Sequence, residues 1–371
     1  GPAHPAGHGA RVPIGPSVDD PALPGLAVLA DAGRAAALMA TALGDDALGA
    51  PTVAVVRHKP GRRALVRLEA PSSDGPAARE PRILFAKAFA GRRAGRAHAA
   101  HAALHRALEG DPLVRLPEPI GWLPSAQLLL LDAVAGRPVA PALAAGDRRL
   151  AARIARAAWR LHASEAALDR RHGPDEEWAI LARRVDGLAA ALPELAAAAG
   201  RVLEALGRAW PSAASWRWRP LHRDLHPGQV LWDGRSVGLV DLDDAALGER
   251  AVDADDFAAH LVWAAIEHRG ARPALAAAAA FRRAYAALDP GLDPRVASVL
   301  EAGTLLRLAA IHGPGASPET ARAVVRAAAA RAAATAHGAP AGWGRDARRA
   351  APRLGYDEPS PRSRTAAEGA G

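Results

Sequence analysis

The densest group of side chains that could do chemistry lies in residues 221–231, which read LHRDLHPGQVL. This segment contains Asp224 and Gln229, and Asp241 follows twelve residues after Gln229. Carboxylates and an amide oxygen form a hard, oxygen-rich set of ligands, which suits Mg²⁺. A carboxylate that is not bound to the metal can serve as base for an incoming hydroxyl. These residue types therefore indicate metal-assisted chemistry on a hydroxyl group.

A predicted β-hairpin explains how these residues can meet. Residues 230–232 and 237–240 are apolar, and they flank a short turn built on Asp233 and Gly234. Residues before the first strand of a hairpin and after its second strand lie at the same open end. Asp224 and Gln229 are therefore expected to lie close to Asp241.

Composition decides how the charge of the chain is interpreted. The 371 residues carry a net charge of +8, and 47 residues are lysine or arginine. Lys59 and Lys87 are the only lysines, so arginine supplies the other 45. Compact ammonium groups at these two positions suit contacts with phosphate. The arginines are spread along the chain among acids, without a block of like charges, so we expect no nucleic-acid partner.

Three other classes of protein are not expected. The chain has no cysteine, which excludes disulfides, thiolate metal sites and a cysteine nucleophile. No uninterrupted apolar run reaches the roughly 18 residues of a membrane span, so we expect no membrane partner. No secretory signal is recognised, and a cytoplasmic location is expected.

The hydrophobic pattern predicts an α+β fold with two lobes. Residues 1–45 form an extension with a helix at 27–43, and residues 339–371 form a disordered tail. Residues 46–135 form an antiparallel sheet with one helix at 92–109. Residues 136–338 form a larger, mainly helical lobe that contains residues 221–245, with helices resuming from about Asp255. The strands of the sheet are predicted at 52–58, 64–69, 83–89 and 127–132.

Residues 221–258 resemble the aminoglycoside phosphotransferase and choline kinase-like small-molecule kinases, which share the protein-kinase-like fold. The resemblance rests on the pattern H-x-D-x-x-x-x-N, followed by an apolar hairpin and a second Asp. A weaker resemblance extends over residues 46–335. This implies transfer of the γ-phosphate of ATP, with Mg²⁺, to a hydroxyl of a small molecule. The acceptor stays open among a sugar, an aminocyclitol or aminoglycoside, and an amino alcohol. Asp243, Asp244, Asp255 and Asp256 are possible sources of local negative charge for a cationic acceptor.

The resemblance also implies a role for individual residues. Asp224 matches the catalytic Asp, and Asp241 matches the Asp that binds Mg²⁺. Gln229 stands at the place of a metal-binding Asn, and Asp243 is a further candidate for contact with the metal. The maltokinase-like branch of this fold also has a Gly-Gln-Val-Leu run here.

Other positions are implied to bind the nucleotide or to support the catalytic loop. Lys87 matches the strand lysine that holds the phosphates. Lys59 and Gly61 lie in the place of the phosphate-covering turn. The backbone of residues 132–134 follows the strand toward the hinge between the lobes, where it would bind adenine. The residues given to nucleotide binding here are thus Lys87, Lys59, Gly61, Asp132 and Val134, and those given to support of the loop are His222 and Asp253.

The chain departs from the family pattern at three places. Gln229 replaces Asn and adds a methylene. The helix after Lys87 has no acidic residue between Arg92 and Leu108, and Glu109 comes late, so the usual lysine–glutamate pair is not visible. The smaller lobe also lacks a G-x-G-x-x-G loop. The missing glutamate motivates one alternative, a nucleotide-binding pseudokinase that acts as a scaffold without turnover.

Overall fold

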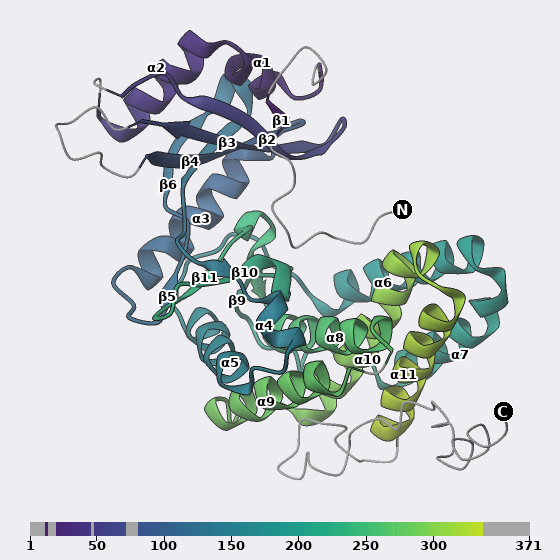
Figure 1. Ribbon diagram of the computed structural model, residues 1–371. Helices are drawn as coiled ribbons and strands as arrows, with labels where there is room; N and C mark the ends of the chain where they lie inside the picture. The colour runs from purple at the N-terminus through teal and green to yellow at the C-terminus, as the bar shows by residue number, and fades with distance from the viewer. Residues whose placement is uncertain (1–11, 14–19, 46–47, 72–80, 270, 337–371) are drawn as a thin grey trace, which may run out of the picture.

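A computed structural model of the chain shows two lobes stacked one on the other (Figure 1). The structure describes residues 12–13, 20–45, 48–71, 81–269 and 271–336. The tail predicted at residues 339–371 lies outside the described residues. The α+β fold predicted from the sequence is confirmed: an antiparallel sheet comes first, and a mainly helical region follows it.

The smaller lobe is built on a six-stranded sheet in which every pair of neighbouring strands is antiparallel. All four predicted strands are present, with bounds within one residue of those expected. In sheet order the strands are β1 (Val12–Pro13), β2 (Thr52–Lys59), β3 (Arg63–Ala70), β4 (Arg82–Phe89), β7 (Leu128–Asp132) and β6 (Pro119–Leu123).

Helices cover both faces of this sheet, and the alternation of side chains along each strand decides which residue meets which helix. Leu84 packs in one cluster with Leu26 on one face, whereas Phe89 packs with Ala97 on the other. Lys87 shares the face of Phe89. The helices are α1 (Pro24–Ala30), α2 (Ala32–Leu43) and α3 (Ala94–Leu108).

The single helix predicted at 27–43 is wrong, because the chain turns at Asp31 and forms two helices. Asp31 leaves the helical conformation, and its carboxylate accepts a hydrogen bond from the amide of Arg34 at 2.9 Å. An aspartate in this position caps the next helix. Composition alone favours a continuous helix here, and only the cap shows the break.

The larger lobe consists mainly of helices. Two small sheets complete it, one with the strand order β5-β11-β10-β8 and one formed by β12 and β9. Its helices are α4 (Ala140–Ala144), α5 (Arg148–His162), α6 (Pro174–Ala191), α7 (Pro193–Ala209), α8 (Ala251–Glu267), α9 (Arg272–Leu288), α10 (Pro294–His312) and α11 (Pro318–Ala336). Its strands are β5 (Val114–Arg115), β8 (Arg137–Pro138), β9 (Arg219–Leu221), β10 (Val230–Trp232), β11 (Val237–Leu239) and β12 (Ala246–Gly248).

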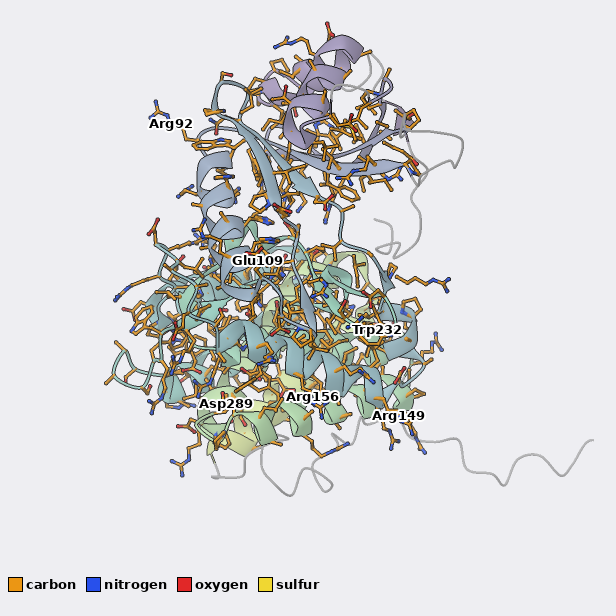
Figure 2. All side chains as sticks on the ribbon, turned by 90° about the vertical axis from the view of Figure 1, so that its left-hand side faces the viewer. Arg92, Glu109, Arg149, Arg156, Trp232 and Asp289 are labelled. Atoms are coloured by element: carbon orange, nitrogen blue, oxygen red, sulfur yellow. The ribbon has the colours of Figure 1, made fainter. Side chains whose placement is uncertain are left out.

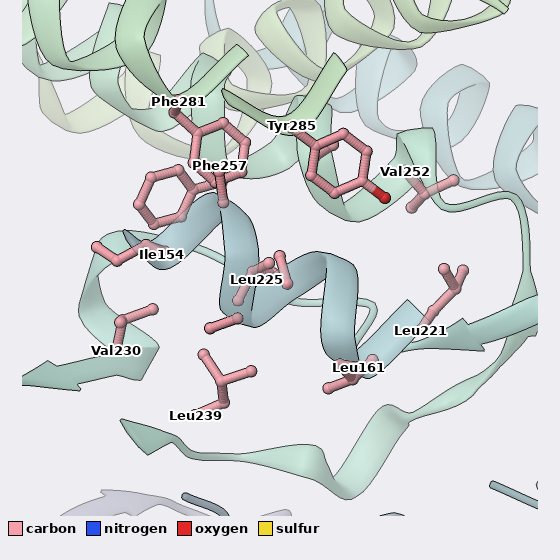
Figure 3. Packing of buried hydrophobic residues seen from close by; sticks show 14 of the residues in the cluster. Ile154, Leu161, Leu221, Leu225, Val230, Leu239, Val252, Phe257, Phe281 and Tyr285 are labelled. Atoms are coloured by element: carbon pink, nitrogen blue, oxygen red, sulfur yellow. The ribbon is translucent and has the colours of Figure 1, made fainter. Parts of the chain in front are cut away.

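One apolar cluster supports the predicted hairpin and the loop before it (Figure 3). Leu225 of the loop and Val230 and Leu239 of the hairpin lie in the same cluster as aromatic side chains of the helices. The rings of Phe257 and Phe281 stack with their centroids 4.4 Å apart. The hairpin residues are therefore anchored in the core of the larger lobe.

Helix α8 begins earlier than expected. The sequence predicts helical structure from about Asp255, but α8 starts at Ala251. Asp255 and Asp256 are therefore not in the first turn and are buried.

Of the described helices, α10 is long and apolar enough to cross a membrane by composition, but 78% of that stretch is buried against its neighbours.

Basic side chains project from both lobes (Figure 2). Arg92 extends from the smaller lobe, and Arg149 and Arg156 extend from the larger one. The positive charge of the chain is therefore distributed over the molecule, as its spacing in the sequence indicates.

Gly238 on β11 is a point of close approach to the segment that joins the lobes. A Cβ atom there would lie 2.6 Å from Cγ1 of Val134 and 3.3 Å from Cβ of Leu231. We expect Gly238→Ala to lower the free energy of unfolding by about 1–3 kcal/mol through overpacking. Urea denaturation followed by circular dichroism measures this change. Gly187→Ala is the control, because that helical glycine has open space around it, and the substitution should stabilise by up to about 1 kcal/mol.

Candidate active site

The loop between β9 and the hairpin is held by one buried carboxylate. Asp253 of α8 is fully buried. Its two oxygens accept the backbone amides of His222 at 2.6 Å and Arg223 at 2.7 Å. Nε2 of His162 lies 3.0 Å from the same carboxylate. Arg223 has φ of +70°, a left-handed conformation that needs such support in a residue other than glycine.

His222 links this loop to the hairpin. Its Nε2 donates to the backbone carbonyl of Val240 at 2.8 Å, and its Nδ1 accepts from the amide of Asp224 at 3.3 Å. The ring is fully buried. The structure thus places His222 and Asp253 on the backbone around Asp224, where the resemblance implies supporting residues.

The hairpin brings Gln229 and Asp241 together. Nε2 of Gln229 lies 3.1 Å from Oδ2 of Asp241, and the backbone carbonyl of Gln229 accepts the amide of Val240 at 3.0 Å. Asp241 itself has φ of +67°. A turn in this conformation directly after β11 directs the carboxylate back toward the open end of the hairpin. This is the proximity that the hairpin geometry predicts.

Lys87 reaches these acids from the other lobe. Its Nζ lies 2.6 Å from Oδ1 of Asp241 and 2.7 Å from Oδ1 of Asp243. Burial lowers the pKa of Lys87, but the two carboxylates outweigh burial and raise the pKa overall. Burial likewise opposes ionisation of Asp241 and Asp243, and the Lys87 ammonium outweighs it, so the pKa of each carboxyl is lowered. All three groups are therefore charged at neutral pH.

Two residues that the sequence analysis did not single out join this cluster. Arg63 of β3 lies 3.8 Å from Asp241 and 3.5 Å from Asp243, measured between guanidinium and carboxylate atoms. His101 of α3 is fully buried, with Nε2 3.2 Å from Oδ1 of Asp243. The signal for Arg63 was its position directly after the predicted turn. Nothing in the spacing of His101 distinguishes it from the other histidines of that helix.

A second group of charges lies beside Asp224. His226 Nε2 lies 3.9 Å from Oδ2 of Asp224, and its ring stacks on His260 with centroids 4.8 Å apart. Burial lowers the pKa of His260, but Asp256 outweighs burial and raises the pKa overall. Burial and the nearby Asp256 raise the pKa of Asp224 above its ordinary value, while His222 and His260 oppose this effect.

The acids of this region are paired with bases. Arg307 contacts Asp256 at 2.9 Å and Glu177 at 3.3 Å. Glu177 also lies 2.6 Å from Nε2 of His172. Asp244 lies within 3.4 Å of Arg93 and 3.2 Å of Arg170. The local negative charge considered for a cationic acceptor is therefore largely neutralised within the protein.

The turn between β2 and β3 is tied to the outer face of the sheet. The amide of Gly61 donates to Oδ2 of Asp20 at 2.8 Å, and Nε2 of His58 lies 2.8 Å from the same oxygen. The amide of Gly61 is therefore already occupied. Burial lowers the pKa of Lys59, as do neighbouring arginines, while Asp224 raises it.

The segment after β7 leads from one lobe to the other. The amide of Asp132 donates to the carbonyl of Glu118 at 2.9 Å, so this amide is also occupied. Val134 lies beside Gly238 of the hairpin sheet. Adenine binding by the backbone of Asp132 and Val134 stays a prediction.

The donor set fits a magnesium ion that is shared with phosphates. Asp241 and Gln229 provide a carboxylate and an amide at the open end of the hairpin, and the Asp241 side chain is 18% exposed. Among the described residues, no group of three His, Asp or Glu side chains is arranged to hold a metal ion by itself. Mg²⁺ commonly takes one or two carboxylates and completes its shell with waters and substrate phosphates. A site completed by the nucleotide matches this arrangement.

Solved structures with this arrangement of lobes define the fold as kinase-like. Wild-type aminoglycoside 2'-phosphotransferase-IIIa in its GDP complex is 13% identical, with 82% of this chain and 99% of that chain covered, at a TM-score of 0.51. APH(2")-IIIa with GDP and kanamycin is 14% identical, with 81% and 98% covered, at a TM-score of 0.51. Choline kinase from Cryptosporidium parvum is 10% identical, with 78% and 91% covered, at a TM-score of 0.51.

The family is shown by the sequence itself. The profile of the phosphotransferase enzyme family, APH, matches residues 48–291, which is more than half of the chain. The protein belongs to this family, as the resemblance in residues 221–258 implies. No curated protein matches the chain significantly.

Two buried aspartates on α8 should respond in opposite ways to the same isosteric substitution. Asp253→Asn replaces a carboxylate that accepts hydrogen bonds from two backbone amides with a side-chain amide, in which an N–H donor takes the place of one acceptor oxygen. We expect it to lower the free energy of unfolding by about 2 kcal/mol, because a buried amide loses its partner. Urea denaturation at pH 7 measures this change.

Asp255→Asn is the matched control on the same helix. Both oxygens of Asp255 are buried without a hydrogen-bond partner among the described residues. Burial, and secondly Glu301, raises its pKa well above the ordinary value. A raised pKa stabilises the fold below the pKa of the unfolded chain, and this stability is lost as the pH rises through the folded-state pKa. Asp255→Asn should therefore stabilise the protein more at pH 8 than at pH 4, and an equal effect at both would contradict the assignment.

Proposed function

We propose that the protein is an ATP-dependent kinase that transfers the γ-phosphate of MgATP to a hydroxyl of a small molecule. The observation that carries this proposal is that Gln229 and Lys87, from separate segments, both contact Asp241. Gln229 ends the supported loop that presents Asp224, and Lys87 reaches Asp241 from the other lobe. Family membership supports the reaction class.

Each group has a defined part in such a transfer. Asp224 would accept a hydrogen bond from the acceptor hydroxyl and orient its oxygen toward the phosphate. Asp241 and Gln229 would hold Mg²⁺, whose chemistry is to neutralise charge on the phosphates. Lys87 would leave its carboxylate partners in part and contact the phosphates. Such catalysis depends on positioning and on electrostatic stabilisation.

The charges beside Asp224 favour a neutral acceptor rich in hydroxyl groups over a polycation. A polycation gains most where carboxylates lack partners. Here Asp256 contacts Arg307 and His260, and Glu177 contacts Arg307 and His172. A sugar or a cyclitol needs hydrogen-bonding partners without net negative charge, and this network provides them. One solved relative binds kanamycin according to its title, so aminoglycosides belong in any test.

The decisive experiment measures ADP release from MgATP over sugars, cyclitols, aminoglycosides and amino alcohols. We expect turnover with a neutral polyhydroxyl acceptor. Asp224→Asn should lower kcat by about 100-fold or more, in the range of a lost general base. Asp241→Ala should also abolish turnover, because the metal loses its carboxylate.

Asp186→Asn is the matched control, because Asp186 is an exposed residue of α6 away from this site. It should retain wild-type turnover. Turnover that survives Asp224→Asn would contradict the proposed mechanism. If the protein binds nucleotide but transfers phosphate to none of the acceptors, the pseudokinase scaffold is favoured instead.

A further inference from the structure

The carboxylate that pairs with Lys87 does not come from helix α3. Kinase-like folds usually place a glutamate of this helix against the strand lysine, and α3 has no acidic residue. Lys87 instead contacts Asp241 and Asp243, which lie two residues apart after β11. Two carboxylates of this segment therefore share the strand lysine.

Asp243 lies deeper than Asp241 and is surrounded by bases. Its side chain is 3% exposed, against 18% for Asp241. Oδ1 contacts Lys87 Nζ at 2.7 Å and His101 Nε2 at 3.2 Å, and Oδ2 lies 3.5 Å from Arg63. Asp241, in contrast, shares its second oxygen with Gln229. Asp241 thus faces the open end of the hairpin, and Asp243 faces the interior and α3.

His101 connects α3 to this carboxylate. The imidazole is fully buried, and its Nε2 donates to Oδ1 of Asp243. The segment that carries Asp243, the short helix η4 (Leu242–Asp244), packs directly against α3. One carboxylate oxygen is therefore shared between the strand lysine and the helix.

We propose that Asp243 is a positioning residue that takes the place of the missing helix glutamate, with His101 coupling α3 to Lys87 through it. This inference rests on the proposed function, since it concerns the lysine that would bind phosphates. It replaces the sequence-based prediction of Asp243 as a metal ligand. This role of Asp243 also explains why α3 has no acidic residue, because the carboxylate that pairs with Lys87 comes from the other lobe.

The two roles of Asp243 make different predictions for metal dependence. A counter-ion of Lys87 affects nucleotide binding whether or not Mg²⁺ is present. A metal ligand affects binding only with Mg²⁺ and raises the concentration of Mg²⁺ needed for half-saturation. Titrations of the protein with fluorescent ADP, first in EDTA and then at increasing Mg²⁺ concentrations, distinguish the counter-ion from the metal ligand.

Moving the negative charge to the helix is the sharpest test. Glutamate is close to histidine in length, so His101→Glu combined with Asp243→Asn places a carboxylate on α3 where Nε2 of His101 now lies. We expect Asp243→Asn alone to weaken ADP binding in EDTA about ten-fold, within the range of coupling between buried neighbours. The double variant should recover to within about three-fold of wild type.

His105→Glu combined with Asp243→Asn is the matched control. His105 lies one turn further along α3, so this variant has the same net charge with the carboxylate at the wrong place. It should show no recovery. His101→Leu gives a second, uncharged variant: it should increase amide hydrogen exchange of α3 in the nucleotide-free protein and leave the Mg²⁺ requirement unchanged.

The outcomes separate this inference from the proposed function. The inference is supported if the wild type binds nucleotide and if His101→Glu, but not His105→Glu, restores binding to Asp243→Asn. A raised Mg²⁺ requirement in Asp243→Asn with unchanged binding in EDTA overturns it and makes Asp243 a metal ligand. Wild type that binds no nucleotide with or without Mg²⁺ overturns the proposed function, and the inference falls with it.

Discussion

The site depends first on one buried carboxylate. Asp253 accepts two consecutive backbone amides, and this fixes the loop that presents Asp224. The left-handed conformation of Arg223 carries a cost of about 1–3 kcal/mol, which persists only where the surroundings enforce it. His162 extends the support, since its second nitrogen lies 2.5 Å from the hydroxyl of Tyr285. The precision of the loop therefore derives from the core of the larger lobe.

The contact between the lobes rests on balanced charge. Lys87 and Arg63 come from the sheet, and Asp241 and Asp243 come from the segment after the hairpin. The most buried of these charges, Lys87 and Asp243, are stable only when they are paired, because desolvation alone would disfavour each one. Phosphates of a bound nucleotide would compete for these cations with Asp241, the more exposed of the two carboxylates. Under the proposed function, binding of the nucleotide would be coupled to the arrangement of the two lobes.

The sequence could predict what short-range patterns encode. A nearly continuous apolar run interrupted by Lys87 defines β4, and an Asp-Gly turn between apolar runs defines the hairpin that joins Gln229 to Asp241. Contacts such as that of Arg307 with Asp256, 51 residues apart, have no local signature. The helix break at Asp31 depends on a single cap that competes with a strongly helical composition. Tertiary packing decides such cases, and it cannot be inferred from the local patterns of a single sequence.

Asp224 lies between two networks that are satisfied in different ways. On the nucleotide side, Asp241 remains partly exposed and its partners are cations that phosphates can also attract. On the other side, buried Asp256 forms an ion pair with half-buried Arg307. Under the proposed function, the first network would rearrange when a nucleotide enters, whereas the second would stay in place. An acceptor would then be selected by fit to the second network, and the nucleotide by exchange of ionic partners.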